Sequence, residues 1–237
     1  MKMLVLAGGF GTRLKSVVSA VPKALAPVGS VPFLHLQIQH WIDQGVMSFV
    51  FLLHHQADSI ISFLKSEKDG LLQNCEVQWL VEPTPLDTGG ALAFAVEQLH
   101  FSGDFLVTNA DTWLGAGLTD MHQVAAPAMA VVKLSDTSRY SRVELNAQNF
   151  VTAFHEKNGV KDIGLINAGL YRLNASLFKD WDNLPYSLER VAFPGLLSLE
   201  CLKAVTLNTD FIDIGIPSDY SRFCRWIEAG RKGVLCS

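Results

Sequence analysis

The chain has 237 residues, of which 49% are hydrophobic and 18% charged, and this balance predicts a folded globular protein with a sizeable core. Its formal net charge of -4 argues against nucleic acid as the main partner, because surfaces that bind a duplex usually carry a basic excess. No apolar stretch approaches the ~20 residues that cross a bilayer, so we expect no membrane segment. The first apolar run, Met3–Ala7, is too short for a signal peptide, and the 4 cysteines lack metal-site spacing. We therefore expect a soluble, cytoplasmic protein with reduced thiols.

Short apolar runs alternate with amphipathic segments through the first half of the chain. This alternation is typical of a mainly parallel sheet that helices cover on both faces. Strands are predicted at Met3–Ala7, Ser48–Leu53, Glu76–Glu82 and Asp104–Ala110, and helices at Phe33–Gly45, Asp58–Lys65 and about Thr88 to Leu99.

The second half contains more strand and less helix. Because no repeat or linker interrupts the sequence, we expect one Rossmann-like α/β domain over residues 1–237. Its mixed, mainly parallel central sheet would be flanked by helices, and ligands would bind beyond the carboxyl ends of its strands. Strands are predicted at Ala128–Leu134, Arg142–Leu145, Val151–Glu156 and Leu165–Leu173, and helices near Ser187–Leu199 and Tyr220–Ala229.

A glycine-rich turn follows the first predicted strand. Three glycines in the segment LAGGFGTRL allow the backbone N–H groups to approach an anion, and Arg13 adds a guanidinium suited to phosphate. No Gly-Lys-Ser/Thr follows, so the segment is not a Walker A loop. Leu14 stands where the dinucleotide fingerprint needs its third glycine, which argues against an NAD(P)-dependent oxidoreductase. The remaining alternative is a plain strand–loop turn.

A second basic element, PKALAPV, places Lys23 between two prolines. LAGGFGTRL, PKALAPV and the helix that opens at Pro32 together resemble the sugar nucleotidylyltransferase family, and the resemblance runs from Met3 to about Tyr220. The resemblance implies an enzyme that joins a nucleoside triphosphate to a sugar 1-phosphate and releases pyrophosphate. It also implies that Leu6, Ala7, Gly8, Gly9, Gly11 and Thr12 bind the nucleotide and that Arg13, Lys23 and Lys157 are catalytic.

The segment after the third predicted strand, VEPTPLDTGGA, is similar to the part of this family that surrounds the nucleobase. The resemblance assigns Glu82, Asp87, Thr88 and Gly89 to the nucleotide. Guanine offers two adjacent donors that a carboxylate accepts together, so the acidic Glu82 and Asp87 favour GTP. The alternative for Asp87 is a cap on the helix that begins at Thr88.

Two aspartates follow apolar segments that are far apart in the sequence. Asp111 follows the fourth predicted strand, and Asp213 lies within FIDIGIP. An unpaired charge among apolar residues is costly, whereas two carboxylates can bind one Mg²⁺. The family places its metal-binding aspartates in such segments, so we expect Asp111 and Asp213 to bind Mg²⁺. Ala110 departs from the glycine that commonly precedes the first aspartate.

The resemblance places the sugar phosphate beside the second half of the chain. It implies that Glu156 accepts sugar hydroxyls and that Lys157 contacts the phosphate, although a Glu-Lys pair by itself is usually solvated. It also assigns Asn109, Asn167 and Gly169 to the sugar, and it relates SLE at residues 187–189 weakly to the same pocket. His54 and His55 receive a structural or rim role only.

The segments PLDTGGA and FIDIGIPSDY resemble guanylyltransferases that act on D-glycero-alpha-D-manno-heptose 1-phosphate. The resemblance therefore favours GTP and this heptose phosphate as substrates and a role in polysaccharide biosynthesis. Mannose 1-phosphate with GTP, or a compact uridylyltransferase of a sugar such as N-acetylmuramate 1-phosphate, are the alternatives. A catalytically inactive nucleotide-sugar sensor is the alternative from another class. A homodimer is compatible with the sequence.

Overall fold

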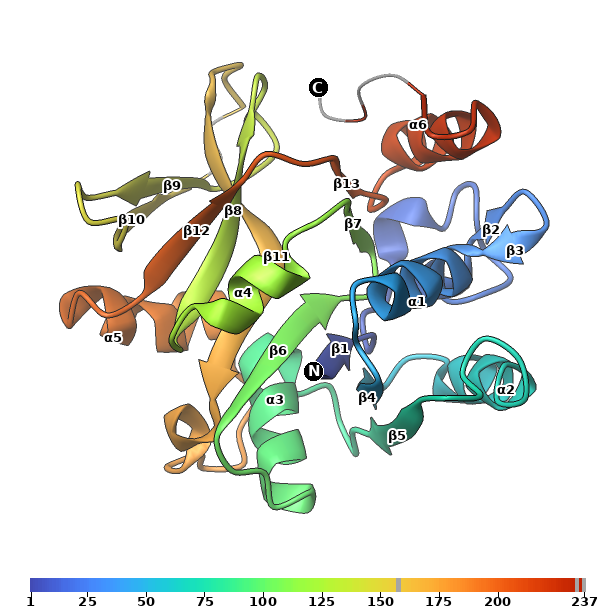
Figure 1. Cartoon of the computed structure of the whole chain (residues 1–237), viewed down its shortest axis with the longest axis horizontal. Helices are drawn as coiled ribbons and strands as arrows, with labels where there is room; N and C mark the ends of the chain where they lie inside the picture. The colour runs from blue at the N-terminus through green and yellow to red at the C-terminus, as the bar shows by residue number, and fades with distance from the viewer. Residues whose placement is uncertain (157–158, 233–234, 236–237) are drawn as a thin grey trace. The chain divides into compact units, whose positions relative to one another are not determined.

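The computed structural model describes residues 1–156, 159–232 and 235 (Figure 1). The chain forms two compact units. The first unit contains Met1–Pro85, Thr108–Gly115 and Asp210–Leu235, and the second contains Leu86–Val107 and Ala116–Thr209. The single domain over residues 1–237 stays a prediction. No helix within the described ranges has the length and apolar character to span a membrane.

The first unit is built on three parallel strands. β1 (Lys2–Leu6) pairs with β4 (Ser48–Leu53), which pairs with β5 (Glu76–Val81), as the alternation of apolar runs and helices predicts. Five of the six residues of β4 are buried. The helices of this unit are α1 (Phe33–Asp43), α2 (Ala57–Ser66) and α6 (Pro217–Glu228), and its short elements are β2 (Pro27–Val28), β3 (Val31–Pro32), η1 (Thr12–Leu14) and η2 (Lys23–Leu25).

A second pair of strands in the first unit brings distant segments together. β7 (Thr112–Leu114) and β13 (Phe211–Asp213) are antiparallel, with Trp113 opposite Ile212. Trp113 and Ile212 belong to a buried cluster with Phe33, Phe223 and Trp226. Because these large apolar side chains pack together, the cluster holds the ends of β7 and β13 side by side.

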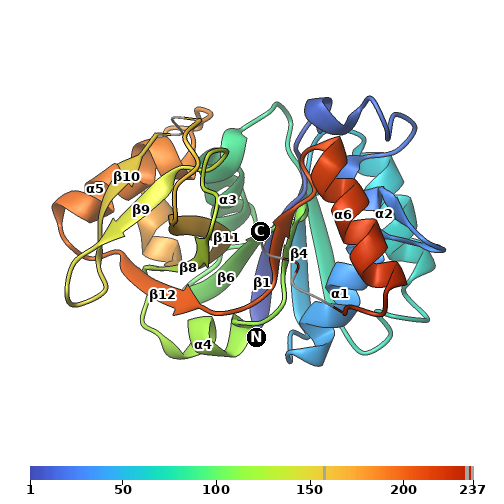
Figure 2. The same cartoon turned by 90° about the horizontal axis from the view of Figure 1, so that it is seen from above.

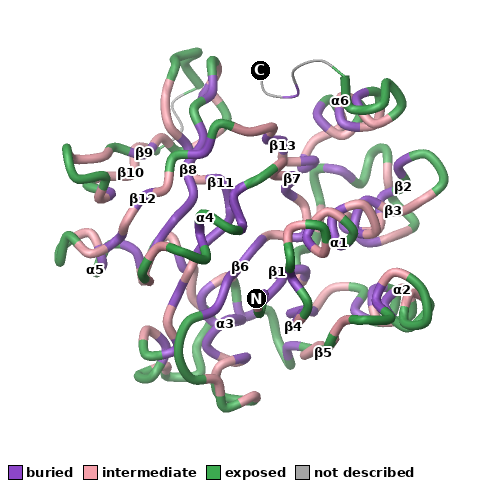
Figure 3. Tube along the Cα trace, in the orientation of Figure 1, coloured by how far each residue is buried: buried purple, intermediate pink, exposed green. Residues whose placement is uncertain are grey.

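The second unit is dominated by antiparallel strands. β11 (Gly164–Asn174) pairs with β8 (Ala128–Leu134) and β9 (Arg142–Leu145), and its register against β8 shifts between Asn167 and Tyr171. β8 is almost fully buried (Figure 3). β6 (Asp104–Asn109) begins in this unit and ends in the first unit. The remaining strands are β10 (Val151–His155), which pairs with β9, and β12 (Lys203–Leu207), which pairs with β8.

The helices of the second unit agree with the prediction at α3 and differ from it elsewhere. α3 (Asp87–Gln98) lies where the sequence predicts a helix, whereas the helix predicted near Ser187–Leu199 is divided. Its first part is a short π-helix, η4 (Leu188–Ala192), and its second part is α5 (Phe193–Ser198), which lies against β10 in Figure 1 and Figure 2. α4 (Leu118–Gln123) and η3 (Ala175–Phe178) are further short helices.

Replacing Phe223 tests the aromatic cluster that holds β7 and β13. Phe223 is fully buried, and its ring centroid lies 4.9 Å from that of Phe33 and 5.4 Å from that of Trp113. Phe223→Ala is expected to lower the free energy of unfolding by about 3–5 kcal/mol, because it removes a buried ring and leaves a cavity. Urea denaturation measures this change. Val17→Ala, at a position that is 55% exposed, is the control, and an equal loss in both variants would contradict the prediction.

Candidate active site

The glycine-rich turn joins β1 to η1. Gly11 has φ 58°, in the left-handed region that side chains disfavour, and a Cβ there would lie 3.1 Å from the Cβ of Lys23. Glycine at this position therefore lets the turn pass close to Lys23. Arg13 follows within η1 and is exposed.

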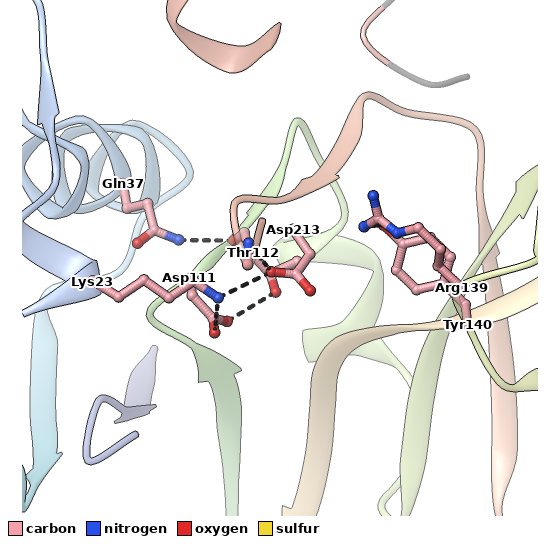
Figure 4. Close-up of polar contacts among 8 residues, drawn as sticks. Lys23, Gln37, Asp111, Thr112, Arg139, Tyr140 and Asp213 are labelled. Carbon is pink, nitrogen blue, oxygen red and sulfur yellow. Dashed lines mark hydrogen bonds and ion pairs between the residues drawn. The ribbon is translucent and has the colours of Figure 1, made fainter. Parts of the chain in front are cut away.

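Lys23 opens η2 and connects two carboxylates. Its Nζ donates to Oδ2 of Asp111 at 2.6 Å and to Oδ1 of Asp213 at 3.1 Å (Figure 4). The lysine side chain is only 10% exposed. The ammonium therefore neutralises part of the negative charge that two neighbouring carboxylates create.

The pairing of β7 with β13 explains why these aspartates are neighbours. Asp213 lies opposite Thr112 in the ladder, and the backbone N–H of Ile214 donates to the carbonyl oxygen of Asp111. The N–H of Gly215 donates to Oδ1 of Asp213 at 2.6 Å. The carboxylate of Asp213 thus has a backbone contact as well as the shared lysine, whereas Asp111 is held at this corner through its backbone carbonyl.

The pKa of Lys23 reflects two opposing effects. Burial lowers the pKa, but the charges and hydrogen bonds of Asp111 and Asp213 raise it, and the net result lies above the ordinary value of 10.5. Lys23 is therefore a cation at neutral pH.

Gln37 supports the same corner and was missed by sequence reasoning. It is 1% exposed on α1, and its Nε2 donates to the carbonyl oxygen of Thr112 at 2.7 Å (Figure 4). Its Oε1 is buried and accepts no hydrogen bond from the described part of the chain. The only signal in the sequence was an amide on the apolar face of a helix.

A cavity of about 260 Å³ lies beside the glycine-rich turn. Most of the predicted nucleotide and catalytic residues of the first unit meet here. Its wall contains Leu6, Ala7, Gly9, Gly11, Thr12, Arg13, Lys23 and Asp111, together with Phe10, Pro22, Ala24, Ala110 and Gly215. Two cationic side chains and a carboxylate thus line one space that is large enough for phosphate groups.

Gly8 has a role different from that of Gly11. A Cβ at Gly8 would lie 2.9 Å from Oε1 of Glu82 and 3.2 Å from the Cβ of His54. Glu82 is 7% exposed, so the missing side chain at Gly8 makes room for this carboxylate. His54 donates from Nδ1 to the carbonyl oxygen of Glu82 at 3.2 Å, which gives that histidine a structural contact.

Asp87, Thr88 and Gly89 lie together at the start of α3. Asp87 is exposed with φ 60°, and its Oδ1 accepts from the N–H of Thr88 at 2.7 Å. It is the first residue of α3, whose N-cap is Leu86 and which has no side-chain cap hydrogen bond, so Asp87 is not the cap that the alternative expected. A Cβ on Gly89 would lie 2.2 Å from the ring of Tyr186. Gly89 therefore allows close packing against Tyr186, a neighbour that sequence reasoning missed.

The predicted sugar residues come from both units. Asn167 and Gly169 are joined by a hydrogen bond from the N–H of Gly169 to Oδ1 of Asn167 at 2.9 Å, within the register shift of β11. Glu156 is exposed after β10, and Asn109 is half-buried at the end of β6. Lys157 lies outside the described residues.

Removing the charge of Lys23 is expected to destabilise the protein. Lys23→Met should lower the free energy of unfolding by about 2 kcal/mol at pH 7, less than for a fully buried pair, because the Asp111 side chain is 39% exposed. Because the pKa of Lys23 is raised in the folded state, the stabilisation is present below pH 10.5 and is lost as the pH rises through the raised pKa.

The measurement is chemical denaturation of wild type and variant from pH 7 to pH 11. The difference should stay constant up to about pH 10 and shrink above it. Lys15→Met removes an exposed lysine nearby and is the matched control. A loss of stability that is equal in both variants would show that the ion pairs contribute nothing specific.

Comparisons with known proteins add to this geometry. Residues 2–220 match the Nucleotidyl transferase family. A D-glycero-alpha-D-manno-heptose 1-phosphate guanylyltransferase of Campylobacter jejuni is 31% identical over 226 residues, which cover 94% of this chain and 98% of that protein. A probable mannose-1-phosphate guanylyltransferase 1 of Oryza sativa is 35% identical over 230 residues, which cover 93% of this chain and 63% of that protein.

A solved structure has the same fold. The crystal structure of HddC from Yersinia pseudotuberculosis has a TM-score of 0.83 and 32% identity, and the match covers 95% of this chain and 99% of that one. The structure of HddC complexed with GMP-PN has a TM-score of 0.81 and 31% identity. This similarity confirms the predicted fold class, a mixed, mainly parallel central sheet flanked by helices.

Proposed function

The chain belongs to the Nucleotidyl transferase family, and on that premise we propose that it transfers GMP from GTP to D-glycero-alpha-D-manno-heptose 1-phosphate. The products are a GDP-sugar and pyrophosphate. The observation that carries the proposal is the cavity beside the glycine-rich turn, where Arg13, Lys23 and Asp111 line one wall. Cations on a phosphate-sized space, with a carboxylate beside them, are the charges that nucleotidyl transfer needs.

The reaction requires no general base. The phosphate of a sugar 1-phosphate is ionised at neutral pH, so its oxygen can attack the α-phosphorus of GTP directly. A new P–O bond forms while the bond from the α-phosphorus to the bridging oxygen breaks, and pyrophosphate leaves with that oxygen. Catalysis then consists of alignment and of stabilisation of the negative charge.

The predicted catalytic residues and several of the predicted binding residues receive a role in this scheme. Arg13 and the N–H groups of the glycine-rich turn would hold the β and γ phosphates, and Lys23 would stabilise the charge that develops during transfer. Lys157 would do the same from the sugar side, where Glu156 and Asn167 would contact hydroxyls. Leu6, Ala7 and Thr12 line the cavity and would enclose the nucleotide.

The carboxylates of Asp111 and Asp213 suit Mg²⁺, which prefers oxygen ligands. The part of the chain that the structure describes contains no cluster of three acidic, histidine or cysteine side chains that could hold a metal. Two carboxylates with phosphate oxygens and water fit Mg²⁺, which commonly keeps several such ligands. Bound there, Mg²⁺ would supply positive charge against the phosphate oxygens.

Glu82 supports the choice of guanine. Its carboxylate is buried beside Gly8, at the start of the glycine-rich turn, and it follows β5 directly. A carboxylate can accept both N1–H and the 2-amino group of guanine, whereas uracil presents one donor between two carbonyl oxygens. The GMP-PN complex of HddC supports the same base.

The heptose phosphate is supported by the Campylobacter jejuni relative, of which the chain covers 98%. The Oryza sativa relative favours mannose 1-phosphate as the second candidate, although the chain covers 63% of that protein. Both sugars are attached to the same kind of reacting phosphate, so the groups that contact the ring hydroxyls must distinguish them.

Pyrophosphate release measures the substrates directly. GTP, UTP, CTP, ATP and dTTP are each combined with heptose, mannose and N-acetylmuramate 1-phosphates, with Mg²⁺ and with a chelator. The expected result is selective turnover of GTP with the heptose phosphate, and loss of that turnover in the chelator. Turnover with UTP or CTP would contradict the guanine assignment. No turnover with any pair, together with tight binding of a nucleotide sugar, would favour the inactive sensor.

Glu82→Gln tests how guanine is recognised. The amide keeps one acceptor but presents a donor to one of the two guanine donors, so the KM for GTP should rise about ten- to a hundredfold, as for the loss of one bidentate base contact. The kcat at saturating GTP should change much less. Steady-state kinetics with GTP and UTP measure both quantities.

Asp87→Gly is the comparison variant. Glycine adopts φ 60° without strain, so this change should keep or raise the free energy of unfolding. If Asp87 also reads guanine, the GTP preference falls. If Asp87 only contacts the N–H of Thr88 at the start of α3, the preference stays. An unchanged GTP KM in Glu82→Gln would contradict the assignment of Glu82 whatever Asp87→Gly does.

A further inference from the structure

Glu189, on η4 of the second unit, accepts hydrogen bonds from three hydroxyl groups. Tyr171 Oη donates to its Oε1 at 3.2 Å, and Thr88 Oγ1 and Ser187 Oγ each donate to its Oε2 at 2.9 Å. Tyr171 lies on β11 and Thr88 on α3. One carboxylate thus joins the strand that carries the predicted sugar residues to the helix that carries the predicted nucleotide residues.

The hydrogen bonds on the sugar side have a defined direction. An ionised carboxylate only accepts, so the single hydroxyl proton of Tyr171 points to Glu189. The Tyr171 oxygen must then accept from Asn167, whose Nδ2 lies 2.7 Å away. The N–H of Gly169 donates to Oδ1 of Asn167. Glu189 therefore determines, through Tyr171, which way the amide of Asn167 is turned.

The hydrogen bonds on the nucleotide side are equally defined. Thr88 Oγ1 accepts from the backbone N–H of Leu188 at 2.8 Å. Its own proton is therefore free to go to Glu189, which accepts it. Because Leu188 and Glu189 are adjacent on η4, two contacts fix the Thr88 hydroxyl at the first turn of α3.

Two local irregularities make this network possible. β11 changes register against β8 between Asn167 and Tyr171, and bulges of this kind redirect side chains beside functional sites. η4 is a single π-helical turn, another feature that is frequent at such sites. Tyr171 is 1% exposed, and burial together with Glu189 raises its pKa well above 10, so its phenol remains a donor at neutral pH.

We propose that Glu189 is a positioning residue that couples the nucleotide side of the site to its sugar side, by orienting Thr88 and, through Tyr171, Asn167. The identity of the ligands that Thr88 and Asn167 contact rests on the proposed function. The hydrogen-bond network itself does not depend on that function. Glu189 acts through its neighbours and is assigned no contact with the substrates.

The kinetic experiment uses Tyr171→Phe, Thr88→Val and Glu189→Gln with the substrate pair that the wild type turns over. Tyr171→Phe should raise the KM for the sugar phosphate about tenfold. Thr88→Val should raise the KM for GTP, and Glu189→Gln should raise both KM values. Thr88→Ser keeps the hydroxyl and should restore most of what Thr88→Val loses. Adding Tyr171→Phe to Glu189→Gln should cost less than in the wild type, because the amide leaves a single acceptor oxygen for three hydroxyl donors and the contact is weakened.

Tyr140→Phe, a change of the same kind outside this network, is the control. Equal KM changes in Tyr140→Phe and Tyr171→Phe would overturn the proposal. Variants that lower only kcat or the melting temperature would also overturn the proposal. A purely structural role would not raise the KM for one substrate more than the KM for the other.

A measurement on the free protein separates this inference from the proposed function. In amide NMR spectra, Tyr171→Phe should shift the resonances of Thr88 and Gly89, and Thr88→Val should shift that of Gly169. Both cross effects should disappear in the Glu189→Gln background. Absence of the cross effects in the wild-type background would overturn the coupling even in an active enzyme. If the cross effects are present in a protein that turns over no substrate pair, the proposed function is contradicted and the coupling stands.

Discussion

The candidate site depends on the ion pairs that the ammonium of Lys23 forms with Asp111 and Asp213. Asp111 and Asp213 come from separate segments and would repel one another when brought together. Lys23 lies within 3.1 Å of both carboxylates, and its side chain is 10% exposed. Removing one member of such a cluster leaves charge without compensation, which costs more than the net value of the contacts. The glycine-rich turn also passes close to this lysine, since a Cβ at Gly11 would lie 3.1 Å from the Cβ of Lys23.

The sequence predicted the ingredients of this site better than their contacts. Asp111, Asp213 and Lys23 were recognisable because their segments resemble those of the sugar nucleotidylyltransferase family, and Asp213 also because it is set among apolar residues. The ion pairs among the three were not foreseen, since they follow from the pairing of β7 with β13. Both strands have three residues, too few to show a period of two, and their partners are far apart in the chain. Long strands and helices such as β4 and α1 were predictable from their apolar spacing.

The glycines show a second limit of sequence reasoning. The sequence suggested that the glycines of LAGGFGTRL bring backbone N–H groups close to an anion, and the family resemblance assigned Gly89 to the nucleotide. In the structure, Gly11 adopts a left-handed conformation, Gly8 leaves space for the carboxylate of Glu82, and Gly89 lies against the ring of Tyr186. The same residue type thus satisfies three different constraints. Only the neighbours in space distinguish them, and two of those neighbours are distant in sequence.

In each unit, one charged side chain contacts several polar groups of opposite character. The charged side chain is a cation in the first unit and a carboxylate in the second. In the first unit, one cation lies between two carboxylates, so removal of the cation leaves repulsion. In the second unit, one carboxylate accepts hydrogen bonds from the hydroxyl groups of Thr88, Tyr171 and Ser187. Its removal leaves these donors without that acceptor. Hydroxyl networks are directional, whereas a point charge is not. Glu189 is therefore suited to orient neighbouring side chains, and Lys23 to balance charge as anionic groups enter the cavity.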